Sequence, residues 1–173
     1  MSVFLVTDGA IIHALNEAAA GWFPELAVVA ASWFVYLLAV LALVPIVSEG
    51  DRARGALITL RIAGGAAVAS AIRMLIGAIA FRPRPFVADP TITLLVEKSA
   101  DSPAFPSGHA TAAFALAYGL FLWDRRVGTV ALVVAVAVGI GRVAVGVHYP
   151  SDIIGGALLG ILASWLVWRF AKK

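Results

Sequence analysis

Residues 127–168 read VGTVALVVAVAVGIGRVAVGVHYPSDIIGGALLGILASWLVW. Two apolar runs, residues 127–145 and 152–168, flank a short polar turn at residues 146–151. A helix needs roughly 20 predominantly apolar residues to cross the hydrocarbon core of a bilayer. Both runs are close to that length, so this stretch predicts two membrane helices joined by a turn at one membrane face.

The composition of the whole chain excludes an ordinary soluble domain. Of the 173 residues, 62% are hydrophobic and only 13% are charged, and the mean hydropathy is +0.98. The net charge of +3 is small, and the arginines are better explained as site or topology residues, so no nucleic-acid partner is expected. Because the chain has no cysteine, disulfides and thiolate metal sites are excluded. The N-terminus lacks the basic region of a removable signal peptide, and we expect none.

Polar breaks divide the rest of the chain into further apolar segments. Three more runs lie at residues 26–47, 55–81 and 107–123. The first 20 residues are mixed: Thr7 and Asp8 are candidate helix caps, and Asn16 is expected to face away from the apolar side. The sequence therefore predicts an all-α, polytopic membrane helical bundle. We expect five spans plus an interfacial helix at residues 1–20, with six spans as the alternative, in a single domain covering residues 1–173.

Basic residues gather on one face when successive loops are assigned to alternate sides of the membrane. This face holds Arg52, Arg54, Arg125, Arg126, Arg169, Lys172 and Lys173. Cytoplasmic loops are enriched in Lys and Arg, so we expect this face to be cytoplasmic. The polar stretch at residues 82–106 and the turn at residues 146–151 then meet at the extracytoplasmic face.

A candidate anion site lies at Pro106-Ser107-Gly108-His109, at the start of an apolar run. The first turn of a helix has unpaired backbone N–H groups and the positive end of the helix dipole, so it binds anions readily. Gly108 would let an oxyanion approach the backbone closely, and His109 would point to the same place. The alternative is an ordinary serine cap followed by an exposed histidine.

A second polar group has the spacing Arg142, five residues, His148, three residues, Asp152. If a helix starts at Pro150, Asp152 can hold one imidazole nitrogen and leave the other free to attack phosphorus. The alternative makes Ser151 or Asp152 a helix cap and His148 an interfacial residue. Arg142 argues against this alternative, because an arginine near a span end needs a partner or an aqueous cavity.

A third motif, Arg82-Pro83-Arg84-Pro85, places two guanidinium groups just beyond an apolar run. Guanidinium forks match phosphate oxygens, and the prolines restrict the backbone that carries them. The alternative is a pair of basic anchors for lipid headgroups.

Two more arginines, Arg61 and Arg73, fall inside the predicted span at residues 55–81, where a charge is costly. Arg73 lies about two helical turns before Phe81 and can reach the site from below. We expect a structural role for Arg61.

Taken in order, these motifs resemble those of the type 2 phosphatidic acid phosphatase superfamily, written Lys-x6-Arg-Pro, Pro-Ser-Gly-His and Ser-Arg-x5-His-x3-Asp. The resemblance extends over residues 55–168, the motif-bearing core. It implies a helical core related to soluble acid phosphatases and vanadium haloperoxidases.

Two positions depart from the family pattern. Counting seven residues back from either motif arginine reaches Gly77 or Leu75, so the family lysine is missing at its usual spacing. Arg73 is the nearest basic substitute. Gly141 stands where the family has a serine. These departures concern how phosphate is held and which headgroup is preferred.

The resemblance implies a role for each matched residue. His148 would be the nucleophile, Asp152 its orienting partner and His109 the general acid. Phosphate would be bound by Arg82, Arg84, Arg142, Ser107 and Gly108, with Arg73 in place of the missing lysine. No metal or other cofactor is implied, because the arginines would neutralise the charge that magnesium neutralises in other phosphoryl-transfer enzymes.

The overall pattern is similar to that of bacterial undecaprenyl pyrophosphate phosphatases within this superfamily. It implies a lipid pyrophosphate substrate at the extracytoplasmic face of the bacterial inner membrane, in carrier recycling for peptidoglycan and cell-wall synthesis. Phosphatidylglycerophosphate and phosphatidate are alternatives with the same chemistry. A different class is a non-catalytic protein that binds or transports lipid headgroups, and a vanadate-dependent peroxidase is a further alternative. Polyprenyl or glycerolipid phosphates and membrane lipids are the expected partners, and the oligomeric state stays open.

Overall fold

The protein is a bundle of helices in the computed structural model, which describes the backbone of residues 3–171 and the side chains of residues 8–171. Within this part of the chain no residue lies in a β-strand, which confirms the predicted all-α class. The helices are α1 (Val3–Trp22), α2 (Pro24–Ser32), α3 (Phe34–Leu41), α4 (Val44–Ser48), α5 (Arg52–Ile79), α6 (Pro85–Ala88), α7 (Gly108–Trp123), α8 (Arg125–Ala144) and α9 (Pro150–Phe170).

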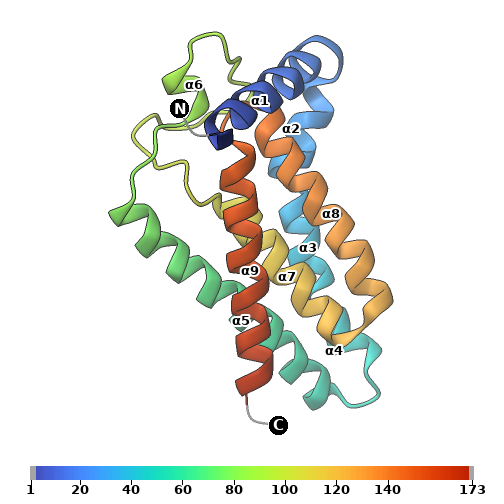
Figure 1. Cartoon of the computed structure of the whole chain (residues 1–173). Coiled ribbons are helices and arrows are strands. Elements are labelled where there is room, and N and C mark those ends of the chain that lie inside the picture. Colours follow the sequence, from blue (N-terminus) through green and yellow to red (C-terminus); the bar gives the residue numbers. More distant parts are fainter. Residues whose placement is uncertain (1–2, 172–173) are drawn as a thin grey trace.

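Long apolar helices form most of the bundle. Among the described residues, four segments are long and apolar enough to cross a membrane: Pro24–Ser48, Arg52–Ile79, Arg125–Ala144 and Pro150–Phe170. The first of these is α2, α3 and α4 in succession. α7 has only 16 residues, but it packs along both α8 and α9 near the middle of the bundle (Figure 1). The predicted runs therefore correspond to observed helices, with ends that differ by a few residues.

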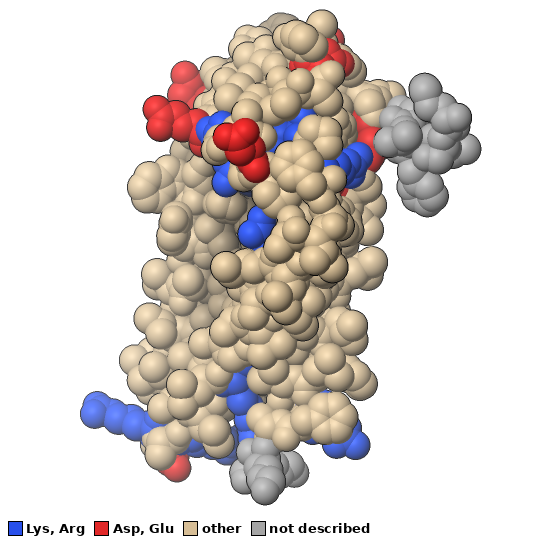
Figure 2. Space-filling model, turned by 90° about the vertical axis from the view of Figure 1, so that its left-hand side faces the viewer, with Lys and Arg blue, Asp and Glu red and all other residues tan. Residues whose placement is uncertain are grey.

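The lateral surface of the bundle is apolar. Exposed side chains on it include those of Val40, Leu60, Val133, Leu158 and Leu162. Figure 2 shows that most charged residues gather at the two ends, with a belt of other residues between them. A lipid-embedded protein presents this distribution, because burying charge in the hydrocarbon core is costly.

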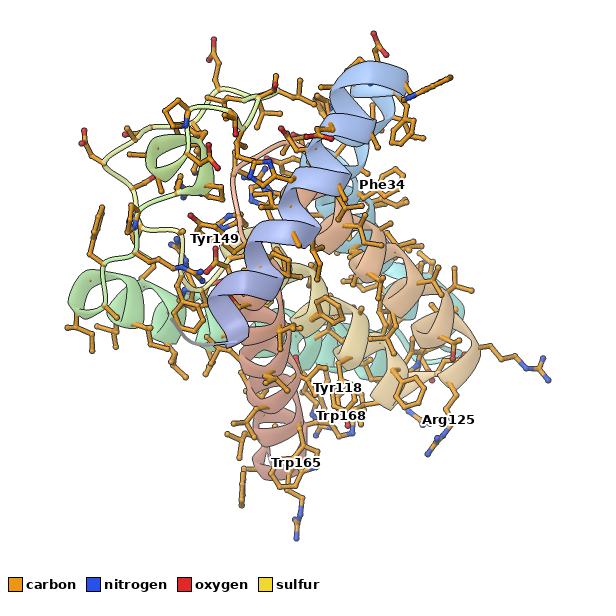
Figure 3. The ribbon with its side chains drawn as sticks, turned by 45° about the horizontal axis from the view of Figure 1, so that its top comes forward. Phe34, Tyr118, Arg125, Tyr149, Trp165 and Trp168 are labelled. Atoms are coloured by element: carbon orange, nitrogen blue, oxygen red, sulfur yellow. The ribbon has the colours of Figure 1, made fainter. Side chains whose placement is uncertain are left out.

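The basic residues that were predicted to share one membrane face lie at one end of the bundle. Asp51 and Asp124 cap the N-termini of α5 and α8, and both helices start at the end where α9 finishes (Figure 1). Figure 3 shows Arg125, Trp165 and Trp168 at this end. Lys172 and Lys173, which belong to the same predicted set, lie outside the described residues.

Small residues let α7 and α9 pack closely. A Cβ atom at Gly160 would lie 2.5 Å from the backbone oxygen of Thr111, and one at Gly156 would lie 2.8 Å from that of Ser107. The Ser107 N–H also donates to the Asp152 backbone oxygen at 3.1 Å. The first turns of these two helices are therefore held side by side, and both histidine motifs reach the same end of the bundle.

The N-terminal helix differs from its prediction. α1 already includes Val3, so Asp8 lies inside the helix and does not cap it, and the side chain of Thr7 lies outside the described residues. The prediction for Asn16 is wrong: its side chain is buried and donates to two backbone oxygens of other segments at 2.8 Å each. α1 lies across the end of the bundle (Figure 1) and is docked there by polar side chains.

Candidate active site

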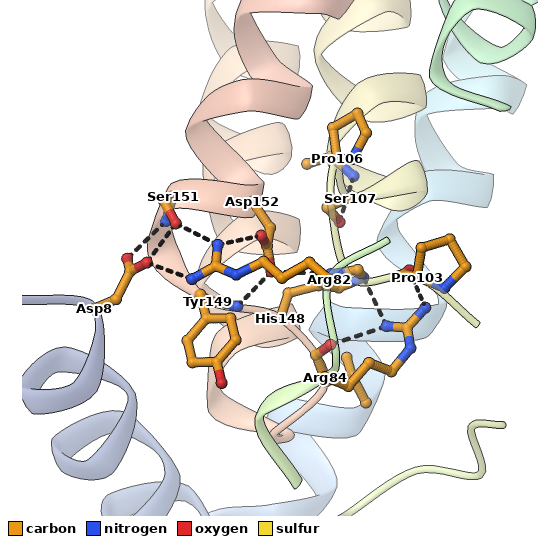
Figure 4. A network of polar contacts seen from close by, with 12 residues as sticks. Asp8, Arg82, Arg84, Pro103, Pro106, Ser107, His148, Tyr149, Ser151 and Asp152 are labelled. Carbon is orange, nitrogen blue, oxygen red and sulfur yellow. Dashed lines mark hydrogen bonds and ion pairs between the residues drawn. The ribbon is translucent and has the colours of Figure 1, made fainter. Parts of the chain in front are cut away.

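The three polar motifs meet at the end of the bundle opposite the C-terminus. The loop after α5 carries Arg82 and Arg84, the first turn of α7 carries His109, and the turn between α8 and α9 carries His148. Tyr149, which follows His148, lies beside α1 at this end (Figure 3). Residues that are distant in sequence thus form one polar cluster (Figure 4).

His148 and Asp152 occupy the centre of this cluster. α9 begins at Pro150, and the Asp152 carboxylate accepts a hydrogen bond from the Tyr149 N–H at 2.8 Å, which closes the first turn. This compact start brings Asp152 Oδ2 to 3.7 Å from His148 Nδ1. The distance is longer than a hydrogen bond, but at this range the carboxylate stabilises positive charge on the imidazole. Both side chains are buried.

The surroundings of His148 favour its neutral form. Burial lowers the pKa of His148 from 6.5 to about 4; Asp152 opposes this shift, and the positive charges of Arg142 and Arg84 add to it. A neutral imidazole has a free lone pair, which a nucleophile needs.

We expect the free protein to keep His148 neutral down to a pH of about 4. A lowered pKa means that the charged form appears only at lower pH. A nitrogen-15 NMR titration in detergent should therefore show the His148 imidazole titrating well below the usual histidine value of about 6.5. The variant His148→Gln identifies the resonance by its loss. A His148 signal that titrates near pH 6.5 would contradict the expectation.

Arg84 is fixed beside the other nitrogen of His148. Its Nη1 lies 3.3 Å from His148 Nε2, and its guanidinium nitrogens donate to three backbone oxygens. Since Nε2 accepts this contact, we infer that the imidazole proton sits on Nδ1, toward Asp152. Burial and the charge of Arg73 lower the pKa of Arg84 to about 10, so the guanidinium stays charged at neutral pH. An anion bound here would lie next to Nε2.

Arg82 is not directed to the same position. Its Nη1 donates to Asp152 Oδ1 and to Ser151 Oγ, both at 2.7 Å, and its Nη2 donates to Asp8 Oδ2 at 2.9 Å (Figure 4). The guanidinium also lies 4.0 Å from the centre of the Tyr149 ring. Carboxylates therefore bind two nitrogens of the guanidinium that was expected to contact phosphate, and the phosphate contact of Arg82 stays a prediction.

Arg142 comes from the last turn of α8 and is buried. Its Nη1 lies 3.5 Å from the Ala31 backbone oxygen, and its Nε, also buried, has no hydrogen-bond partner among the described residues. Leaving a buried charged donor unpaired is costly. The charge of Arg142 acts on both His109 and His148, so an anion bound between the histidines would satisfy this guanidinium.

The N-terminus of α7 faces the same region. Ser107 caps the helix, with its Oγ accepting from the Ala110 N–H at 3.5 Å. Arg73 reaches across from α5, and its Nε donates to the Pro106 backbone oxygen at 3.2 Å. A Cβ atom at Gly108 would lie 3.4 Å from Arg73 Nε. Arg73 thus lies at the helix start that the sequence identified as an anion site.

His109 connects the polar cluster to an apolar groove. It is half-buried in the first turn of α7, and its neighbour Gly108 lines the same groove. The other walls are apolar or aromatic and are formed by Val35, Tyr36, Ala39, Ala112 and Leu116. The groove has a volume of about 400 Å³ and lies between α3 and α7 on the lateral surface, where Tyr36 is 62% exposed.

Lys98 is a further cation near the site that the motif analysis missed. Its loop is attached on both sides: the Leu95 N–H donates to the Val145 backbone oxygen at 3.3 Å, and Ser102 Oγ accepts from Arg84 Nε at 3.0 Å. Burial and the charges of the site arginines lower the pKa of Lys98. The signal was available in the sequence, because Lys98 is the only lysine outside the C-terminal pair.

Arg61 lies at the opposite end of the bundle. Its Cζ is 5.8 Å from the centre of the Trp168 ring, and both residues line a cavity with Trp123. This position keeps Arg61 away from the polar cluster, as expected of a structural residue.

The cluster has the chemistry of a phosphate site. It combines the cations Arg73, Arg84, Lys98 and Arg142 with a helix N-terminus and two imidazoles, and the Asp152 carboxylate lies beside one of these imidazoles. In the described part of the chain, no three His, Asp or Glu side chains gather as metal ligands. The arrangement can bind a phosphate, attack it with one imidazole and exchange protons through the other.

Comparisons with known proteins place the chain in a family. The model of the PAP2 superfamily matches residues 56–173. Undecaprenyl-diphosphatase BcrC of Bacillus subtilis (strain 168) is 36% identical over 100 residues, which cover 58% of this chain and 51% of that protein. The putative undecaprenyl-diphosphatase YbjG of Escherichia coli (strain K12) is 31% identical over 163 residues, which cover 92% of this chain and 80% of that protein.

A solved structure shows the same fold. The crystal structure of Aquifex aeolicus LpxE superposes with a TM-score of 0.76 at 19% identity, covering 98% of this chain and 97% of that chain. The chain spans about half the length of the curated Bacillus relatives that it matches. The family match nevertheless covers more than half of this chain and includes every motif described above. The chain is an integral membrane protein and belongs to the PAP2 superfamily.

Proposed function

We propose that this single-domain protein is a metal-independent lipid phosphatase that converts undecaprenyl pyrophosphate to undecaprenyl phosphate through a phosphohistidine on His148. One observation carries the proposal: Arg84 Nη1 lies 3.3 Å from His148 Nε2, while Asp152 Oδ2 faces His148 Nδ1 at 3.7 Å. One nitrogen is oriented, and the other lies where an arginine would hold the phosphate. The names of the B. subtilis and E. coli relatives support this choice of substrate.

The first step transfers the terminal phosphoryl group to the enzyme. Arg84, Arg142 and the N-terminus of α7 bind its oxygens, and His148 Nε2 attacks phosphorus in line with the bridging oxygen. The N–P bond forms as the P–O bond breaks, and the electron pair of that bond goes to the departing oxygen. His109 gives this oxygen a proton, while Asp152 stabilises the positive imidazole ring.

The second step releases phosphate. His109, now neutral, accepts a proton from a water molecule whose oxygen attacks the phosphohistidine. The N–P bond breaks, inorganic phosphate leaves, and His148 returns to its neutral form. His109 thus acts first as acid and then as base, and no other proton carrier is needed.

Two features support a lipid substrate at the outer face of the membrane. The apolar groove beside His109 can take part of a lipid chain while the headgroup reaches the arginines. The basic loop ends lie at the opposite end of the bundle, which favours a site on the extracytoplasmic side of a bacterial inner membrane. Polyprenyl phosphates and membrane lipids are the partners that this position implies.

A comparison of substrates tests the proposal. The purified protein in detergent with EDTA should release inorganic phosphate from undecaprenyl pyrophosphate with a kcat/KM at least about tenfold above that for phosphatidylglycerophosphate, phosphatidate or the short isopentenyl pyrophosphate. A higher value for either glycerolipid would move the proposal to that substrate. Binding of all the lipids without phosphate release would favour a headgroup-binding or transport protein. An equal kcat/KM for isopentenyl pyrophosphate would show that the groove does not bind the lipid chain.

A further inference from the structure

Asp8 extends the polar cluster to the N-terminal helix. Arg82 lies between two carboxylates, with Nη1 2.7 Å from Asp152 Oδ1 and Nη2 2.9 Å from Asp8 Oδ2 (Figure 4). The side chain of Asp8 is 8% exposed and that of Asp152 is fully buried. Such short, charge-assisted contacts with a guanidinium fork are both strong and directional.

Asp8 also holds the first turn of α9. Its carboxylate accepts from the Ser151 N–H at 2.9 Å and from the Ser151 hydroxyl. That N–H is one of the donors that a helix start leaves unpaired, and an anion there interacts favourably with the helix dipole. Asp8 therefore binds both the arginine that contacts Asp152 and the residue that precedes Asp152.

These contacts determine how Asp152 meets His148. Asp152 Oδ1 accepts from Arg82, and Oδ2 accepts from the Tyr149 N–H at 2.8 Å, so each carboxylate oxygen has a fixed donor. The Arg82 guanidinium lies 4.0 Å from the centre of the Tyr149 ring, and this contact restricts rotation of the guanidinium. The contact between Arg82 and Asp8 of α1 therefore helps to fix the orientation of Asp152 Oδ2, the oxygen that faces His148.

The balance of charge gives Asp8 a second effect. The charged or titratable groups that act on His148 are Arg84 from the loop before α6, His109 from α7, Arg142 from α8 and Asp152 from α9. Asp152 is the only anion in this set. If Arg82 had no other carboxylate, its full charge would fall on Asp152 and weaken the support that Asp152 gives to a positive imidazole.

We infer that Asp8 and Arg82 are positioning residues that orient Asp152 and preserve its negative charge for His148, so that docking of α1 completes the active site. Neither residue needs to touch the substrate. The kinetic consequence rests on the proposed function, whereas the effect on the His148 imidazole in the free protein does not. Asp8 is absent from all three motifs, since it lies in a helix that precedes them in the chain.

The variant Asp8→Asn tests this inference, because it keeps the size of the side chain and removes its charge. We expect kcat for undecaprenyl pyrophosphate to fall about tenfold, as is typical when an outer partner of an active-site group is removed, with KM nearly unchanged. Glu17→Gln is the matched control, since Glu17 is an exposed carboxylate on the same helix. An Asp8→Asn protein with the same kcat as Glu17→Gln would overturn the inference, as would a tenfold higher KM at unchanged kcat.

The imidazole of His148 gives a readout that a merely structural role would not produce. In Asp8→Asn the surroundings of His148 become more positive, so the pKa of His148 should fall below its wild-type value. Loosened packing would instead admit water and raise the pKa of His148 toward 6.5, which would overturn the inference even if kcat fell. Because this titration needs no substrate, its result stands even if the protein does not hydrolyse the proposed lipid.

A second variant keeps the inference testable if Asp8→Asn does not fold in detergent. Arg82→Lys retains the charge but cannot span both carboxylates with a planar fork. We expect it to lower kcat about tenfold and to leave KM unchanged, as a group acting only in the transition state would. A kcat equal to that of the wild type would overturn the inference.

Discussion

Replacing His148 with glutamine should reduce phosphate release from undecaprenyl pyrophosphate by at least about 10³-fold, because the variant has no nitrogen that can form the N–P bond. Glutamine keeps a polar side chain of similar size beside Arg84, so substrate binding should change little. With substrate labelled in its terminal phosphate, the wild-type protein stopped in alkali should retain label as phosphohistidine, whereas His148→Gln should retain none. The ratio of the two initial rates measures the effect.

His13→Gln is the control for this experiment. His13 lies at the same end of the bundle, but its Nε2 is 3.0 Å from Asp89 Oδ2, and it belongs to none of the motifs. We expect His13→Gln to release phosphate at nearly the wild-type rate and to carry the label. A labelled His148→Gln protein would mean that another residue is the nucleophile and would end the proposed mechanism.

The motif residues that the sequence grouped together are those whose positions depend on local structure. His148 and Asp152 are four residues apart, and a proline at the start of α9 is enough to bring them near each other. Arg84 and Arg142 lie next to predicted span ends, so alternation of the spans places them at the same face. Length, hydropathy and alternation therefore predict both the bundle and the centre of the site.

The sequence could not predict contacts that depend on how α1 docks. Asp8 and Ser151 are 143 residues apart, and no spacing rule connects them. Asn16 is a polar residue of a type that is usually exposed. It is nevertheless buried, because α1 lies across the bundle and the side of α1 that carries Asn16 faces the loop with Thr93. For the same reason the contact of Arg82 with Asp8 could not be predicted: the motif shows that a guanidinium is present but does not show that a carboxylate from α1 binds it.

The positions of His109 and the apolar groove lead to the second large effect. His109→Gln should slow hydrolysis of phosphatidate by about 10²- to 10³-fold, because the departing alkoxide is strongly basic and must receive a proton as it leaves. The same variant should slow hydrolysis of 4-nitrophenyl phosphate less than about tenfold, since nitrophenolate leaves readily without a proton. The loss of rate for undecaprenyl pyrophosphate should lie between these two, because its leaving group is a phosphate that ionises near pH 6.

The ordering of these three substrates separates proton transfer from the other ways in which His109 could act. If His109 only bound the phosphate, all three rates would fall by the same factor, because the transferred group is identical in each. If it only shaped the groove, the two lipids would suffer equally and the soluble ester would be spared. Ala112, which lines the same groove, offers no proton, so Ala112→Val should affect both lipids alike and serves as the control for shape. A graded loss that follows the basicity of the leaving group is expected only if His109 delivers the proton, and this in turn requires His109 and His148 to act on opposite sides of the same phosphorus atom.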